Sequence, residues 1–426
     1  MGSFQVRGLG LTAIFAAGLL LAGCGDQVAD PAPEPEPAIA EPNTTDPLAA
    51  HVTLEDGDGY TRGLGEKAGA LIEVIRPDAW NGDLVLLMHG IAPADAPITL
   101  RHPTHWQTQP AIDDLVARGY GVALSSYRKN GPAVAEGTID TRIAQATFTS
   151  EFGRPERTYL WGWSMGGAVG HQLLEHAPSR YDGLLSVCSS QIGGIPQNEY
   201  QLDARLLFDY YFPGALPWAI GETNADLFTE VLPAIQAAFV ADPAGYIEKV
   251  QKMAAIDQLQ LPLGTGTPTE FILTILGSNL AFGGGGAAII DAYDGMPVGN
   301  ADRVYTSDVL SDAELADINA GIARFEADPN ARRRVERLTP TGRTRGTPIL
   351  ALHTDGDAVV PVRFPQQYEE IAAATGNADS YALRVVPAFA HCELNPDLAP
   401  DGFRDIQIQA FDDLVRWVED GVEPTP

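Results

Sequence analysis

Residues 157–176 read RTYLWGWSMGGAVGHQLLEH, and this stretch indicates the fold more clearly than any other. It begins with a predicted strand at 157–161, passes through Gly162-Trp163-Ser164-Met165-Gly166, and continues into a segment with helical spacing at 166–176. The pentapeptide fits the pattern G-x-S-x-G. Between a strand and a helix, this pattern is typical of a tight, strained turn that holds a serine hydroxyl above the end of a sheet. The stretch therefore predicts a strand–turn–helix unit with Ser164 as a nucleophile.

Short apolar runs alternate with helical patterns on both sides of this unit. The clearest run is 84–88, which reads LVLLM and is apolar throughout, as expected of a parallel strand that helices cover on both faces. The alternation predicts an α/β fold with a doubly wound, mostly parallel sheet. It stops within 191–346, where helical patterns dominate, so we expect a mainly helical cap there. The predicted sheet domain comprises 51–190 and 347–426.

A serine hydroxyl becomes a useful nucleophile only when an imidazole takes its proton and a carboxylate orients that imidazole. The segment HTDGDAVVP at 353–361 follows a predicted strand and offers Asp357, with Asp355 as the alternative acid or as a turn-forming residue. The segment PAFAHC at 387–392 ends the last predicted strand and offers His391 as the base. Nucleophile, acid and base therefore follow one another along the chain, each at the end of a strand.

The order of these elements resembles the α/β-hydrolase family, in its serine esterase, lipase and peptidase branch. The resemblance covers about 70–190 and 347–418. It implies the triad of Ser164, Asp357 and His391, and it implies that two backbone N–H groups stabilise the oxyanion. One belongs to Met165, and the other to Ile91 in the segment MHGI at 88–91.

Three further residues are expected near the substrate. His89 precedes the oxyanion segment, where it is expected to support the structure, Tyr127 follows another predicted strand, and Trp163 directly precedes the nucleophile. We expect all three to line the substrate pocket. His102 and His105 lie close together in the sequence but lack a third ligand nearby, so a metal site is not expected there.

The resemblance implies acyl transfer to water without a cofactor or a metal. The first hypothesis is hydrolysis of a carboxylic ester of a small molecule through an acyl-enzyme. Because the same residues also cleave amides, a peptidase or amidase acting on short peptides stays open as an alternative. A non-catalytic binding module that retained the fold is the second alternative.

The N-terminus has the composition of an export signal. Arg7 precedes an apolar run that ends in Leu21-Ala22-Gly23-Cys24, which resembles the lipobox of bacterial lipoproteins. The resemblance implies a signal peptide at 1–23, a lipid on Cys24, and anchoring in a bacterial envelope. Gly25 after the cysteine favours the outer membrane. Proline-rich residues at 24–50 are expected to form a tether.

The net charge excludes one class of binding partner, and the cysteine content raises the question of a disulfide. The 426 residues carry a net charge of −29, so phosphate backbones repel the chain and nucleic-acid binding is not expected. Cys188 and Cys392 are the two cysteines besides Cys24. An exported protein meets oxidising conditions, and the sequence leaves open whether they are two thiols or one disulfide. It gives no indication of an oligomeric state.

Overall fold

The computed structural model describes residues 46–105, 107–392 and 402–425, without the side chain of residue 403. The predicted signal peptide, Cys24 and most of the predicted tether lie outside these residues. In the part of the chain that is described, no helix is both long and apolar enough to cross a membrane.

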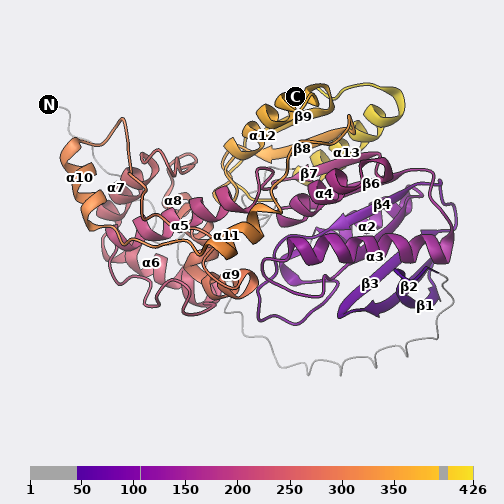
Figure 1. Cartoon of the computed structure of the whole chain (residues 1–426), viewed down its shortest axis with the longest axis horizontal. Coiled ribbons are helices and arrows are strands. Elements are labelled where there is room, and N and C mark those ends of the chain that lie inside the picture. The colour runs from indigo at the N-terminus through magenta and orange to yellow at the C-terminus, as the bar shows by residue number, and fades with distance from the viewer. Residues whose placement is uncertain (1–45, 106, 393–401, 426) are drawn as a thin grey trace. The chain divides into compact units, whose positions relative to one another are not determined.

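A nine-stranded sheet organises the fold (Figure 1). Its strands lie in the order β1-β2-β3-β5-β4-β6-β7-β8-β9. The pairs along β1-β2-β3-β5 are antiparallel, and those along β5-β4-β6-β7-β8-β9 are parallel. The strands span His51–Asp56 (β1), Tyr60–Lys67 (β2), Ala70–Pro77 (β3), Leu84–Met88 (β4), Gly121–Ser125 (β5), Thr158–Trp163 (β6), Gly183–Val187 (β7), Ile349–Thr354 (β8) and Tyr381–Val386 (β9).

Helices cover both faces of the sheet. On one face, α2 (Thr108–Ala117) and α13 (Phe403–Asp420) pack on the strands, and their apolar residues join one buried cluster with the side chains of β4 to β8. On the other face lie α3 (Val134–Phe152), α4 (Met165–His176) and α12 (Arg363–Ala374). All five residues of β4 are buried, because both of its faces are covered. The prediction of a doubly wound, mostly parallel sheet is confirmed.

The chain between β7 and β8 forms a helical insertion, as predicted. Seven α-helices lie in it: α5 (Gly194–Tyr211), α6 (Leu232–Ala241), α7 (Pro243–Ala254), α8 (Pro268–Ser278), α9 (Gly286–Tyr293), α10 (Asp312–Gly321) and α11 (Pro329–Glu336). Two π-helical turns lie among these helices: η3 (Leu227–Val231) directly precedes α6, and η4 (Leu280–Gly284) lies between α8 and α9. The insertion buries apolar side chains of its own, including Phe208, Ile235, Met253 and Ile275.

Candidate active site

Ser164 occupies the sharp turn between β6 and α4. Its φ is +52° and its ψ is −123°, a conformation that costs energy for any residue with a side chain. The turn is feasible because its flanking residues are glycines. A Cβ on Gly162 would collide with the backbone of Gly166, and a Cβ on Gly166 would collide with the carbonyl of Met88. The predicted strand–turn–helix unit is therefore present, and it places Ser164 at the carboxyl end of the parallel strands.

The structure brings the three predicted triad residues into one hydrogen-bonded row. Ser164 Oγ lies 2.9 Å from His391 Nε2, and His391 Nδ1 lies 2.7 Å from Asp357 Oδ2. Asp357 and His391 are both buried, whereas Ser164 is half-buried. Because the carboxylate can only accept, it holds the imidazole proton on Nδ1 and leaves Nε2 free to accept the serine proton. This row can deprotonate Ser164 and stabilise the imidazolium that results.

The two candidate acids have different surroundings. Asp357 binds His391 through Oδ2, while its Oδ1 accepts the N–H groups of Val359 (2.8 Å) and Val360 (2.9 Å). Asp355 is exposed, and its Oδ1 accepts the N–H of Ala388 at 2.9 Å. Asp355 therefore links the acid loop to the histidine loop, and the structure places Asp357 rather than Asp355 at the imidazole.

The segment 89–92, which carries the predicted oxyanion donor Ile91, lies against the nucleophile. A Cβ on Gly90 would lie 3.2 Å from Ser164 Cβ and 3.8 Å from its Oγ. His89 Nδ1 lies 2.7 Å from Gly90 O. Because a peptide group is planar and trans, this bond also fixes the direction of the Ile91 N–H, at the opposite end of the same peptide. Met165, the second predicted donor, is the first residue of α4, where an N–H has no partner within the helix.

His89 belongs to a stack of aromatic rings beneath this segment. Its ring centroid lies 4.0 Å from that of Tyr127 and 4.6 Å from that of His105. The Tyr127 hydroxyl donates to His89 O at 3.2 Å, and His105 Nε2 lies 3.1 Å from Ile91 O. Burial lowers the pKa of His89 to about 4 and that of His105 to about 3, so both rings are neutral near pH 7. The stack therefore supports the segment 89–92 without adding charge beside the predicted oxyanion donor.

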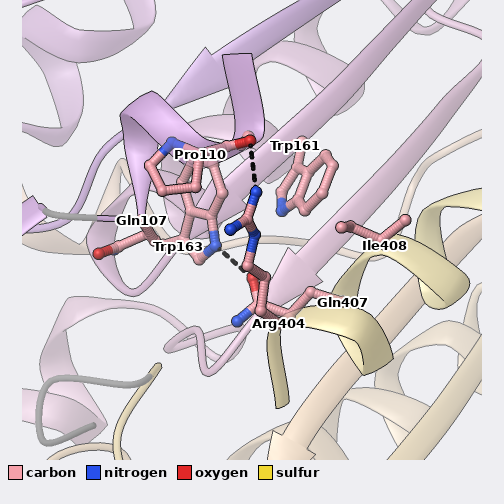
Figure 2. Close-up of a pocket in the computed structure, with 8 residues that line it drawn as sticks. Gln107, Pro110, Trp161, Trp163, Arg404, Gln407 and Ile408 are labelled. Carbon is pink, nitrogen blue, oxygen red and sulfur yellow. Dashed lines mark hydrogen bonds between the residues drawn. The ribbon is translucent and has the colours of Figure 1, made fainter. Parts of the chain in front are cut away.

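Two of the three expected pocket-lining residues have a different role in the structure. Tyr127 is 0% exposed and acts from beneath the oxyanion segment. Trp163 is 1% exposed, and its indole N–H donates to Gln407 Oε1 at 2.8 Å on the face covered by α2 and α13 (Figure 2). A small pocket on that face is lined by both Trp161 and Trp163. Successive strand side chains alternate between faces, so Trp163 shares the face of Trp161. The prediction that Tyr127 and Trp163 line the substrate pocket is therefore corrected, because both are buried.

Cys188 and Cys392 lie together beside the triad. Cys188 follows β7, Cys392 follows His391, and no disulfide joins them in the structure. Their sulfur atoms and a ring nitrogen of His391 all lie within 4.8 Å of one another, the one such group of metal-ligating side chains among the described residues. Both nitrogens of His391 are already engaged by Ser164 and Asp357, and burial raises the pKa of the Cys392 thiol. His391 is therefore occupied by the predicted triad, and the structure has the two cysteines as thiols, with Cys392 Sγ donating to Val187 O at 3.2 Å.

The sequence did not identify several polar residues around the acid. His353 Nε2 lies 2.8 Å from Val360 O and 3.5 Å from Asp357 Oδ2, and burial lowers its pKa. Gln197 and Tyr200 of α5 bind the carbonyls of the acid loop. Their partners are backbone oxygens far away in the chain, and no spacing in the sequence indicates such contacts.

The chain matches no family model and no curated protein. Among solved structures, it is similar to feruloyl esterase B from Aspergillus oryzae, with a TM-score of 0.46 and 13% identity over 86% of this chain and 82% of that one. Lipase A from Candida antarctica gives a TM-score of 0.45 and 13% identity over 86% and 79%. The rice cell wall degrading esterase LipA from Xanthomonas oryzae gives 0.42 and 15% over 84% and 90%. At this level of identity, the function has to be inferred from the site itself.

Proposed function

We propose that the protein is a serine hydrolase that cleaves a carboxylic ester through an acyl-enzyme. The observation that carries this proposal is the row Ser164 Oγ–His391–Asp357, with hydrogen-bond distances of 2.9 Å and 2.7 Å. A base must lie within hydrogen-bond reach of the proton that it removes, and His391 satisfies this condition before any substrate is bound. The strained turn at Ser164 supports the same role, since strain of this kind is common at catalytic residues.

The reaction follows from the geometry. His391 Nε2 takes the Ser164 proton as Oγ attacks the acyl carbon, and the carbonyl oxygen becomes an oxyanion between the N–H groups of Met165 and Ile91. His391 then gives that proton to the leaving alkoxide as the C–O bond breaks. In the second half-reaction, water takes the place of the serine hydroxyl. His391 takes a proton from the water, the hydroxide attacks the acyl group, and Ser164 regains a proton as the carboxylic acid is released. Asp357 accepts the hydrogen bond from His391 Nδ1 in both half-reactions and stabilises the imidazolium.

The experiment is turnover of a panel of p-nitrophenyl esters and aminoacyl anilides by the purified protein and by Ser164→Ala. We expect ester turnover in the wild type and its loss in the variant. Cleavage of anilides in preference to esters would assign the same machinery to a peptidase or amidase. If neither panel is cleaved and a fluorophosphonate does not react, the hydrolase proposal fails, and the non-catalytic alternative replaces it.

We also propose that the protein is anchored in a bacterial envelope by a lipid on Cys24. The support is the segment Leu21-Ala22-Gly23-Cys24 after a short apolar run, which lies outside the described residues. Cells that express Cys24→Ser should lose palmitate labelling of the protein and release it from the membrane fraction. Unchanged labelling would contradict the lipid anchor.

A further inference from the structure

Helix α5, the first helix of the insertion, reaches the loop that carries the acid. The side-chain N–H of Gln197 donates to Val359 O at 2.7 Å, and the hydroxyl of Tyr200 donates to Ala358 O at 2.8 Å. Gln197 is half-buried and Tyr200 is buried, so water competes poorly for these carbonyls. The loop therefore depends on α5 for two of its hydrogen bonds.

The two peptide groups bound by α5 are the same two that bind the carboxylate. The N–H groups of Val359 and Val360 donate to Asp357 Oδ1 at 2.8 Å and 2.9 Å. Since a peptide group is planar and trans, Ala358 C=O and Val359 N–H are the two ends of one rigid unit. The same holds for Val359 C=O and Val360 N–H. Each unit is thus held by α5 at its oxygen and by the carboxylate at its nitrogen.

We propose that Gln197 and Tyr200 are positioning residues for the catalytic triad. Two directed N–H groups on Oδ1 fix the rotation of the Asp357 carboxylate, and this rotation directs Oδ2 at His391 Nδ1, 2.7 Å away. A hydrogen bond to a peptide oxygen also polarises the N–H at the other end of the peptide, which strengthens its bond to the carboxylate. The inference rests on the proposed function, because that function gives Asp357 its task.

The helix is anchored firmly enough for this role. Within the insertion, Arg205 donates to Phe282 O and to Trp218 O, each at 2.7 Å. Toward the sheet domain, the Tyr200 ring packs edge-on against Phe364 with 6.3 Å between the centroids, and the guanidinium of Arg363 lies 5.2 Å from the Tyr200 ring centre. A site is held most accurately by side chains on such rigid elements. The insertion therefore acts on the chemistry as well as on any choice of substrate.

The experiment compares Tyr200→Phe, Gln197→Leu and the double variant in the full chain. Tyr200→Phe removes only the hydroxyl and keeps the ring that packs on Phe364. The matched control is Tyr246→Phe on α7, since that buried hydroxyl has no hydrogen-bond partner among the described residues. We expect kcat for a p-nitrophenyl ester to fall about 3- to 10-fold in each single variant and about 10- to 50-fold in the double variant. KM should not change, and the control should behave as the wild type.

A second readout separates positioning from simple docking of the insertion. In the proton NMR spectrum, the low-field resonance of the His391 Nδ1 proton should move or broaden in the double variant and stay in place in Tyr246→Phe. A double variant with wild-type kcat and an unmoved resonance would overturn the inference and leave the proposed function intact. A change in melting temperature alone, with kcat preserved below the transition, would overturn it equally. A wild type without esterase activity or fluorophosphonate reactivity removes the proposed function and this inference together.

Discussion

Asp357→Asn tests how the acid acts, because the structure dictates which way the new amide must turn. Asp357 Oδ1 accepts two backbone N–H groups, so the amide oxygen of the asparagine has to stay there. Its NH₂ group then faces His391 Nδ1, which can meet a donor only by giving up its own proton. The imidazole proton moves to Nε2, where it points at Ser164 Oγ in place of the lone pair that should accept the serine proton.

We expect kcat of Asp357→Asn to fall by about 10⁴-fold, the order of loss known for a triad histidine held in the wrong tautomer. This corresponds to about 5 kcal/mol of transition-state stabilisation. Steady-state hydrolysis of a p-nitrophenyl ester measures this loss in kcat, and KM should change little. Asp355→Asn is the matched control: it replaces an exposed carboxylate that accepts one N–H, and it should retain most of the activity. More than a tenth of wild-type kcat in Asp357→Asn, or equal losses in both variants, would refute the reasoning.

Three further perturbations follow from the structure. His89→Phe keeps a ring on Tyr127 but removes the bond to Gly90 O, so kcat should fall about 10-fold at constant KM; an unchanged kcat would show that the Ile91 N–H needs no such support. Burial lowers the pKa of His171 to about 3, whereas the unfolded chain binds this proton below about pH 6.5. The free energy of unfolding should therefore fall as the pH drops from 6.5 toward 3, and between pH 7.5 and pH 5 the wild type should lose about 2 kcal/mol more than His171→Leu in urea titrations; parallel losses would contradict this. The structure has Cys188 and Cys392 as thiols, so both should be alkylated without reductant in the denatured protein; resistance of both to alkylation before reduction would show that they form a disulfide.

The parallel strands β4 to β8 were predictable from the sequence, because they are buried on both faces and are therefore mostly apolar. The hairpin of β1 and β2 was missed for the opposite reason: most of its residues are half-buried or exposed, and no apolar run marks it. Within the insertion, α8 begins with a capping box formed by Thr267 and Glu270, a signal that can be read from the sequence.

For the site, chain order and strand ends sufficed to select the three residues that the structure brings together. What the sequence could not indicate was support through the backbone: Gln197, Tyr200 and His353 act on carbonyl oxygens, which are present at every position. Trp163 was assigned to the pocket from its place next to Ser164. The alternation of side chains along β6 would have placed it beside Trp161 in the core.

The central claim is that Ser164 carries the acyl group during turnover, and trapping that intermediate tests it most directly. The protein is mixed with a p-nitrophenyl ester, quenched in acid within the first turnovers, digested, and analysed by peptide mass spectrometry. We predict the mass of the acyl group on the peptide that contains Ser164 in the wild type, and its absence in Ser164→Ala. Steady hydrolysis by the wild type without an acylated peptide, or with the acyl group on another residue, would contradict the claim.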